Sequence, residues 1–399
     1  MSDGRSVYPS VFMLPGRDRR LRSGHPWVYS NEIRMNAEAL ALAPGTPVVL
    51  NRVDGKALGV GTFNPHALIA FRLFSTEAGA VLDAAFAGAR MRRALALRER
   101  LFDQPYYRLV HAEADGLPGL VADRFGGTLV VQATTAGMER LLPEVLAAAG
   151  DVLGPEAVVL RNDAPARRAE GLDAYVRLAS GDLDGAVEVR EGSLKFIADL
   201  MGGQKTGWFF DQRDNRAFVA TLAGGARMVD VYCHSGGFAI AGAVAGASEV
   251  LAFDRSQAAI ELAHRAAVEN GVDGRSTFER GDAFEVMEAL GQAGERFAVV
   301  AADPPAFVKS RGELKSGLKG YRKLARLAAR LVEPGGFLFL ASCSHNVKAG
   351  AFAQEVGRGM ARAGRAGRII RSAGAGADHP VHPFLPESAY LKTLVLQLD

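Results

Sequence analysis

Residues 229–240 read "VDVYCHSGGFAI", an apolar stretch that runs through a Ser-Gly-Gly turn into small and apolar residues. In an α/β protein, a strand that leads through glycines into a helix is typical of a nucleotide-type cofactor site. Backbone amides can approach a ligand only where side chains are absent. We therefore expect a strand, a turn that contacts a cofactor, and a helix. The expected cofactor residues of this stretch are Asp230, Tyr232, Ser235, Gly236 and Gly237.

Strands and helices are expected to alternate around this stretch, from about residue 191 to the end of the chain. The strand-like segments are "RMVDVYC", "EVLAFDRS", "STFERGD", "FAVVAADPP", "GGFLFLASCS" and "YLKTLVLQL", with helical segments between them. Such alternation predicts an α/β fold with a mainly parallel, doubly wound sheet.

The chain upstream of residue 191 has a different pattern. Short β-type runs such as "TPVVLNR" and "ALIAFRLF" are separated by Gly and Pro turns, and "VDGKALGVG" is a hairpin signal. A helix over "DAAFAGARMRRALALRERLF" leads into a mixture of strands and helices. We predict three domains: a β-rich module over 1–75, a central α+β domain over 76–190 and the doubly wound domain over 191–399.

Composition excludes several classes of protein. The 399 residues are 48% hydrophobic and 23% charged, and no apolar run approaches the roughly 20 residues of a membrane helix. The opening "MSDGRSVYPS" has no apolar stretch of the secretory type. Cys233 and Cys343 are the only cysteines, which excludes a disulfide framework and a cysteine-cluster zinc site. We expect a cytoplasmic protein with no membrane partner and no metal site.

Charge is unevenly distributed along the chain. The net charge is +3, but residues 1–75 carry nine Lys and Arg against five Asp and Glu. An excess of cations permits an anionic partner, although a solvated basic face is the plainer interpretation. The assembly state stays open, with a homodimer as the candidate.

Carboxylates follow three further strands of the expected sheet. Asp254 ends "VLAFD", Asp282 follows "STFERG", and Asp303 ends "VVAAD". Ligands of doubly wound sheets bind at the carboxyl ends of the strands, so these side chains are expected at one rim. A single strand-end Asp is more often a turn or helix-cap residue. Four coincident strand ends favour a ligand site.

The spacing and glycine pattern favour S-adenosylmethionine as the ligand. Asp254 lies 17 residues after Gly237, close to the roughly 20 at which a carboxylate binds ribose hydroxyls. Cys233 and His234 stand where a dinucleotide-binding fingerprint has its first glycines. The turn is therefore poorly suited to bind a pyrophosphate. A cationic sulfonium suits an acidic pocket, and Asp282 is expected near the adenine amino group. The sequence therefore predicts a methyltransferase.

Cys343 follows the fifth strand, at the same rim as Asp303. Consecutive parallel strands are usually neighbours, so the two side chains are expected to face one crevice. Addition of a thiolate to carbon 6 of cytosine turns carbon 5 into a nucleophile for a methyl group. We predict Cys343 as the nucleophile and Asp303 as the acid that offsets charge on the ring. The alternative is a structural turn at Asp303 and a small buried hydrophobe at Cys343.

Longer motifs then resemble one known family. "GGQKTGWFFDQRDNR", "VDVYCHSGGFA", "ADPPAFVKS", "KGYRKLARLAARLVEPGGFLFLASCSHNV" and "DHPVHPFLPESAYLKTLVLQL" resemble the class I S-adenosylmethionine-dependent methyltransferases that form 5-methylcytosine in large-subunit ribosomal RNA. "LRSGHPWVYSNEI" and "GVGTFNPHALIAFRLFS" look like the N-terminal PUA RNA-binding domain of that family, and "EADGLPGLVADRFG" like its central domain. Nearly the whole chain is covered.

The resemblance implies a PUA domain, a central α+β domain and a C-terminal Rossmann-like methyltransferase domain that acts on ribosomal RNA. It also implies that Gln212 and Arg216 of "DQRDNR" line the cofactor pocket, where an arginine can pair with the methionine carboxylate. Many RNA 5-methylcytosine enzymes have a second Cys beside the Asp-Pro turn. This chain has Pro304, Pro305 and Ala306 there, which leaves Cys343 to act alone.

Three other functions stay open at this point. An N-methyltransferase would position an exocyclic amine with Asp303, the carbonyls near Pro304 and the ring of Phe307, without a covalent intermediate. An RNA-binding assembly factor would keep the crevice without catalysis. A methyltransferase of small molecules is less favoured, because a basic β-rich module has no obvious use in it.

Overall fold

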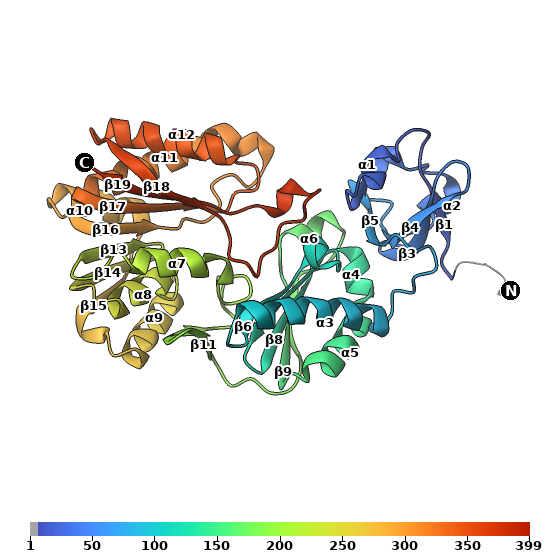
Figure 1. Cartoon of the computed structure of the whole chain (residues 1–399), viewed down its shortest axis with the longest axis horizontal. Helices are drawn as coiled ribbons and strands as arrows, with labels where there is room; N and C mark the ends of the chain where they lie inside the picture. The colour runs from blue at the N-terminus through green and yellow to red at the C-terminus, as the bar shows by residue number, and fades with distance from the viewer. Residues whose placement is uncertain (1–6) are drawn as a thin grey trace. The chain divides into compact units, whose positions relative to one another are not determined.

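The structure of the protein is a computed structural model that describes residues 7–399. The chain forms two compact units that interleave along the sequence (Figure 1). The first unit runs to Gly185 and includes Leu200–Trp208 and Asp378–Ser388. The second unit consists of Ala186–Asp199, Phe209–Ala377 and Ala389–Asp399. The predicted domain borders at residues 75 and 190 stay predictions.

A five-stranded sheet forms the N-terminal part of the first unit, in the order β1-β3-β4-β5-β2. Strands β1 and β3 are parallel, and the other pairs are antiparallel. Apolar side chains such as Val11, Val28 and Phe71 are buried between the sheet and its short helices. The elements are β1 (Ser10–Phe12), α1 (Arg19–Arg22), β2 (Trp27–Tyr29), η1 (Ser30–Glu32), α2 (Ala37–Leu40), β3 (Thr46–Asn51), β4 (Ala57–Phe63) and β5 (Ile69–Ser75).

A second five-stranded sheet follows, in the order β10-β9-β8-β7-β6. Helices α3 and α5 pack together and bury residues such as Met91 and Val145 with this sheet. The elements are α3 (Ala84–Leu101), β6 (Tyr106–His111), η2 (Ala112–Asp115), β7 (Leu120–Phe125), β8 (Thr128–Ala133), α4 (Ala136–Arg140), α5 (Leu142–Leu153), β9 (Ala157–Asn162), α6 (Ala166–Ala169) and β10 (Tyr175–Ser180).

The segment Asp378–Ser388, which contains η6 (Pro386–Ser388), joins this unit through buried polar bonds. The fully buried guanidinium of Arg98 pairs with Asp115 and also donates to the carbonyl oxygen of Asp378 at 3.0 Å. The backbone N–H of Arg108 donates to the Asp378 carboxylate at 3.0 Å. These bonds satisfy groups that would otherwise be buried without partners.

The second unit contains a seven-stranded sheet in the order β15-β14-β13-β16-β17-β19-β18. The first five of these strands are parallel, and β19 runs antiparallel to both of its neighbours. The strand order reverses between β13 and β16, where ligands of such sheets bind. The strands are β13 (Arg227–Val231), β14 (Glu249–Asp254), β15 (Ser276–Arg280), β16 (Phe297–Ala302), β17 (Val332–Ser342), β18 (Gly367–Ala373) and β19 (Lys392–Leu398).

Helices connect these strands, and a two-stranded ribbon precedes them. Residues such as Val229, Val300 and Leu338 are fully buried, as expected of parallel strands covered on both faces. The remaining elements are β11 (Val187–Glu191), β12 (Leu194–Ala198), η3 (Phe210–Gln212), α7 (Arg213–Ala220), α8 (Gly237–Val244), α9 (Gln257–Glu269), η4 (Asp273–Arg275), α10 (Ala283–Gln292), η5 (Arg311–Glu313), α11 (Leu314–Leu331) and α12 (Ala349–Arg362).

The predicted α/β architecture is thus confirmed, with one strand missed. Strand β18 pairs with β19 at the edge of the sheet. Its side chains are mostly exposed, and Ile369 and Ile370 are among the exposed apolar residues. An exposed edge strand has no buried face, so its sequence shows neither an apolar run nor a clear alternation.

Candidate active site

The glycine turn after β13 has the backbone of a close-approach site. Tyr232 (φ 69°), His234 (φ 50°) and Gly236 (φ 83°) all have left-handed backbone conformations. A Cβ atom at Gly236 would meet Ile240 and Ala263 at 3.0–3.1 Å, so both the φ angle and the packing favour glycine there. Left-handed non-glycine residues are uncommon and gather at functional sites. Gly237 then begins α8, as the sequence predicts.

Asp230 lies beneath this turn and is almost completely buried. Its Oδ2 accepts a hydrogen bond from the N–H of Ala239 at 2.9 Å, in the first turn of α8. Its Oδ1 has no hydrogen-bond partner among the described residues. Burial raises the pKa of Asp230 to about 7, and the carboxylates of Asp303 and Asp254 also raise it. The three predicted carboxylates therefore act on one another electrostatically.

Asp254 stabilises the turn from the end of β14. Its two carboxylate oxygens accept the N–H of His234 at 3.0 Å and the N–H of Ser256 at 2.9 Å. The side chain is half-buried. Ser235 is fully buried, and its Oγ lies 3.2 Å from Nδ1 of His234. A carboxylate with spare lone pairs at this rim fits the predicted ribose site.

Asp282 caps α10. Its Oδ1 accepts the N–H groups of Phe284 at 3.0 Å and Glu285 at 3.4 Å, which is the structural role that competes with ligand binding. Burial raises the pKa of the Tyr232 hydroxyl, and the Asp282 carboxylate also raises it. Tyr232 and Asp282 thus belong to the same edge of the site. The contact of Asp282 with adenine stays a prediction.

Asp303 is held by a chain of amide side chains. Nε2 of Gln212 donates to Oδ2 of Asp303 at 2.8 Å, and Oε1 of Gln212 accepts from Nδ2 of Asn215 at 2.7 Å. Asn215 in turn accepts from the hydroxyl of Thr393 on β19 at 3.2 Å. Gln212 is 2% exposed, so the network fixes Asp303 from the inner side of the rim.

Arg216 has a partner within the unit. It is buried on α7, and its guanidinium forms a two-pronged ion pair with Glu191 at the end of β11. It also donates to the carbonyl oxygen of Phe209 at 3.0 Å. The ion pair between Arg216 and Glu191 links α7 to the two-stranded ribbon of β11 and β12. Binding of a methionine carboxylate by Arg216 stays a prediction, and Glu191 is a partner that the sequence motif did not reveal.

Cys343 follows β17 at the same rim as Asp303. Strands β16 and β17 are hydrogen-bonded neighbours with Ala302 opposite Leu340, which confirms the expected adjacency. Cys343 is half-buried, whereas Cys233 is buried.

The buried hydroxyl of Tyr321 joins the residues on both sides of Cys343. It accepts from Oγ of Ser342 at 2.8 Å and lies 2.8 Å from Oγ of Ser344. The N–H of Val308, in the loop that follows Asp303, donates to the same Ser344 oxygen at 3.2 Å. No sequence signal distinguishes Tyr321, because its spacing to apolar neighbours on α11 is that of a core residue. We call the hydroxyls of Tyr321, Ser342 and Ser344 the hydroxyl clamp.

Lys392 lies beside the same turn. It stands opposite Ser342 in the β17–β19 register, and its ammonium donates to the carbonyl oxygens of Ser344 and Tyr390, both at 2.6 Å. Burial lowers the pKa of Lys392 to about 8, while the Cys343 thiolate raises it. A cation and a thiol that interact electrostatically are typical of a reactive cysteine site. In the sequence, Lys392 is only a lysine at the start of a strand, so its place beside Cys343 could not be predicted.

These residues fit a cationic methyl donor. The rim combines a glycine turn, a buried carboxylate oxygen on Asp230 that lacks a protein partner among the described residues, and two further carboxylates. Such a site attracts positive charge and repels a pyrophosphate. Within residues 7–399, no group of three or more His, Cys, Asp and Glu side chains is arranged to hold a metal ion. No helix in this range is long and apolar enough to span a membrane.

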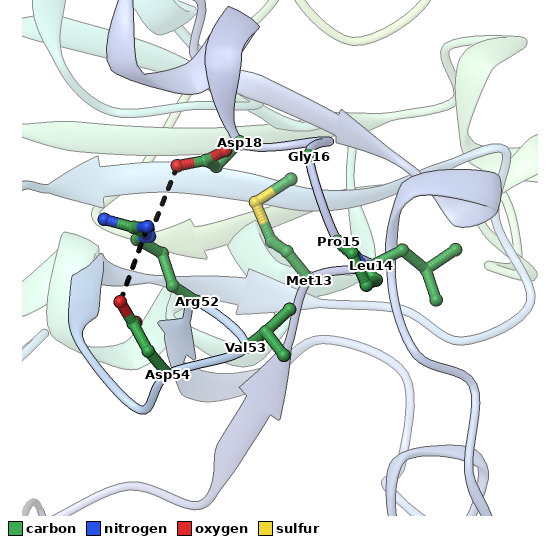
Figure 2. A pocket seen from close by; sticks show the side chains of 8 residues that line it. All are labelled: Met13, Leu14, Pro15, Gly16, Asp18, Arg52, Val53 and Asp54. Atoms are coloured by element: carbon green, nitrogen blue, oxygen red, sulfur yellow. Dashed lines mark ion pairs between the residues drawn. The ribbon is translucent and has the colours of Figure 1, made fainter.

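A pocket of about 290 Å³ lies on the N-terminal five-stranded sheet, and none of the rim residues is among its lining residues (Figure 2). Its apolar side chains include Met13, Leu14 and Val53. Arg52 lies between Asp18 and Asp54, at 3.5 and 3.4 Å. Asp18 also pairs with Arg22 at 3.6 Å, so the two carboxylates are balanced by two guanidinium groups and the pocket offers no excess positive charge to a phosphate.

Comparison with known families matches two parts of the chain. Residues 11–76 match the PUA-like domain, and residues 165–365 match the S-adenosylmethionine-dependent methyltransferase family. The chain is an S-adenosylmethionine-dependent methyltransferase that carries an N-terminal PUA-like domain.

Full-length relatives narrow the family. A protein from Klebsiella pneumoniae subsp. pneumoniae named ribosomal RNA large subunit methyltransferase I is 32% identical over 393 residues, which cover 97% of this chain and 98% of the relative. A protein of the same name from Cronobacter sakazakii is 33% identical over 389 residues, with 96% and 97% covered. This chain belongs to the family of these enzymes, which confirms the family expected from the sequence.

Solved structures share the fold over the whole chain. The crystal structure of SMU.776, described as a methyltransferase and complexed with SAH, has a TM-score of 0.83 at 17% identity and covers 98% of this chain and 100% of its own. A SAM-dependent methyltransferase structure from Streptococcus mutans has a TM-score of 0.82 at 17% identity with the same coverage.

Proposed function

We propose that this chain methylates carbon 5 of a cytosine in large-subunit ribosomal RNA. The names of its relatives supply the substrate class, and its PUA-like domain supplies an RNA-binding module. The observation that carries the proposal is the hydroxyl clamp, because it holds both neighbours of the half-buried Cys343 beside the loop that follows Asp303. Bound S-adenosylmethionine supplies the electrophilic methyl group.

Cys343 and Asp303 have distinct roles in this reaction. The Cys343 thiolate would add to carbon 6 of the cytosine ring, and the electron pair displaced to carbon 5 would form the new bond to the methyl group while the methyl–sulfur bond breaks and S-adenosylhomocysteine is released. Asp303 in its protonated form donates to the ring nitrogen and stabilises the charge that develops there. Loss of the proton on carbon 5 then expels the thiolate and restores the ring. Gln212 holds the Asp303 carboxyl group in position.

The remaining rim residues are proposed to bind the cofactor. Asp254 accepts the ribose hydroxyls, Asp282 and Tyr232 border the adenine, and the Ser235–Gly237 turn approaches the donor. Asp230 places a carboxylate beneath the sulfonium, and Gln212 and Arg216 border its methionine end. We also propose that the protein works in the cytoplasm, as a relative of ribosomal RNA methyltransferases.

Loss of the thiol tests the proposed chemistry. Cys343→Ala should abolish formation of 5-methylcytosine in large-subunit ribosomal RNA, measured by mass spectrometric mapping of RNA from cells that carry each variant. Binding of S-adenosylhomocysteine, measured by calorimetry, should be retained. Cys233→Ala is the matched control, because Cys233 is buried in the turn and should not be required.

Other outcomes would identify a different function. An N-methylated base that persists in Cys343→Ala would contradict the nucleophile and favour N-methylation at the Asp303 turn. Cofactor binding without any transfer of labelled methyl to ribosomal RNA by the wild type would favour an RNA-binding assembly factor. Efficient methylation of free nucleosides would favour a small-molecule enzyme.

A further inference from the structure

The segment that leads from the Asp303 loop into α11 is strongly basic. Residues 304–332 contain eight Lys and Arg side chains and a single acidic residue, Glu313. The cations are Lys309, Arg311, Lys315, Lys319, Arg322, Lys323, Arg326 and Arg330.

Five of these cations are exposed and have no carboxylate partner among the described residues, and four of the five lie at or before the N-terminal half of α11: Lys309, Arg311, Lys315 and Lys319. We call these four the α11 cation row. Further along the helix the pattern changes, because Arg322 pairs with Glu355 and Lys323 with Glu288. The row lies at the end of the helix that adjoins the Asp303 loop, whereas the fifth exposed and unpaired cation, Arg330, stands alone at the opposite end of α11.

Glu313 does not neutralise the α11 cation row. Its Oε2 accepts the backbone N–H groups of Lys309 and Ser310, both at 3.0 Å, in a capping box. The only carboxylate of the segment is thus used to shape the loop. The charges of the four side chains remain directed to solvent.

The placement of the row opposes helix stability. Lys315 and Lys319 are four residues apart and so lie on one face of α11, opposite the buried Tyr321. The first turn of α11 contains no acidic residue. Cations near a helix N-terminus are unfavourable, because the helix dipole is positive there. An external anion would offset this unfavourable charge.

The row is rigidly joined to the loop that follows Asp303. A Cβ atom at Gly317 would lie 2.3 Å from Val308 and 2.5 Å from the carbonyl oxygen of Phe307, so the loop packs directly on the helix at a glycine. The hydroxyl clamp also connects this loop to α11 through Tyr321 and Ser344. A strand bound along the row would therefore be positioned relative to Asp303 and Cys343.

We infer that the α11 cation row binds the phosphate backbone of the RNA strand that carries the target base. The inference rests on the proposed action on ribosomal RNA, and it adds a contact surface on the methyltransferase unit to the one expected on the PUA-like domain. Lys and Arg side chains that contact phosphates fix the register of a strand without reading its bases. The row thus holds the strand while a base enters the active site.

Replacement of two exposed lysines tests the inference in the full-length protein. The double variant Lys315→Gln/Lys319→Gln is compared with the wild type for binding to large-subunit ribosomal RNA transcribed in vitro, at several salt concentrations. Loss of two phosphate contacts should lower the slope of log affinity against log salt by about 1.4, since each single-strand contact contributes about 0.7. If the two proteins bind equally at 1 M salt, where these contacts are screened, this change in slope corresponds to a roughly 25-fold weaker affinity of the variant at 0.1 M salt. The rate of methylation at saturating RNA and the affinity for S-adenosylhomocysteine should not change.

The matched control is Arg330→Gln/Arg362→Gln, which removes the same charge from exposed positions at the C-terminal ends of α11 and α12. Affinity and salt slope close to those of the wild type are expected. Equal weakening in both double variants, or no weakening in Lys315→Gln/Lys319→Gln, overturns the inference while leaving the proposed function intact. A wild-type protein that neither binds nor methylates ribosomal RNA overturns both.

Discussion

The hydroxyl oxygen of Tyr321 lies 2.8 Å from that of Ser344. It also accepts a hydrogen bond from Ser342, so one buried side chain of α11 bonds to both neighbours of Cys343. Burial raises the pKa of the Tyr321 hydroxyl, which keeps it protonated and able to donate. The position of the thiol is therefore determined by a helix as well as by the strand that precedes it.

Tyr321→Phe should lower the rate of methylation by more than its effect on the stability of the fold explains. Loss of the shared hydroxyl should lower the free energy of unfolding by about 1–3 kcal/mol, the cost of buried hydrogen bonds. Methylation should fall by about 10- to 100-fold, because small errors in the position of reacting groups are costly. Calorimetry should give an unchanged affinity for S-adenosylhomocysteine.

The control is Tyr107→Phe in the other unit. Tyr107 is also buried, and its hydroxyl accepts from Arg124 at 3.2 Å. This variant should lose comparable stability with an unchanged methylation rate. A wild-type rate in Tyr321→Phe would show that the hydroxyl clamp does not position Cys343.

Lys392→Met should change how the reactivity of the Cys343 thiol depends on pH. The thiolate raises the pKa of Lys392, so by reciprocity the Lys392 ammonium favours the thiolate. Removal of the ammonium should move the midpoint of iodoacetamide alkylation of Cys343 to higher pH. The rate of alkylation against pH, followed by mass spectrometry, measures this shift.

Lys392→Arg provides the comparison, because it keeps the charge. Its alkylation midpoint should stay close to that of the wild type. Identical profiles for the Met and Arg variants would rule out an electrostatic role for Lys392.

Asp230→Asn should stabilise the protein at neutral and higher pH. The pKa of Asp230 is raised from 3.8 to about 7, so its contribution to stability is complete below pH 3.8 and is lost as pH rises through 7. The variant should therefore gain a few kcal/mol of unfolding free energy at pH 8, since one pKa unit corresponds to about 1.4 kcal/mol. Urea denaturation at pH 5 and pH 8 tests this, and an equal effect at both values would contradict it.

Asp254→Asn should weaken cofactor binding. An amide in place of the carboxylate has one acceptor oxygen, so it cannot accept both the N–H of His234 and that of Ser256 while binding ribose hydroxyls. We expect a loss of about tenfold or more in affinity for S-adenosylhomocysteine by calorimetry, equivalent to one charge-assisted hydrogen bond of about 1.5–3 kcal/mol. Asp273→Asn at an exposed position of η4 should bind as the wild type does.

The positions of the predicted site residues followed from one rule of α/β sheets. Loops at the carboxyl ends of parallel strands share a rim, so the residues after each strand could be grouped before their contacts were known. The structure has these residues at or just beyond the carboxyl ends of β13, β14, β15, β16 and β17. Their partners were less predictable. Gln212 reaches Asp303 across 91 positions of sequence, and no local pattern encodes such a pair.

Tyr321 and Lys392 show why the rest of the site was missed. Tyr321 shares the apolar face of α11 with Leu324 and Ala328, so its spacing indicates only burial. Lys392 reaches the Cys343 turn because β19 runs antiparallel beside β17. That reversal depends on the path of the C-terminal segment, which includes the exposed strand β18 that shows no strand pattern.

The chain changes unit five times, at residues 185, 199, 208, 377 and 388. Neither unit can therefore be expressed as one uninterrupted piece. A fragment that stops at Gly185 would leave the fully buried Arg98 without the Asp378 carbonyl and would release the N–H of Arg108 from its carboxylate. The methyltransferase and RNA-binding functions of this protein should therefore be studied by point substitution. Truncation would remove segments that are distant in sequence but belong to the same unit.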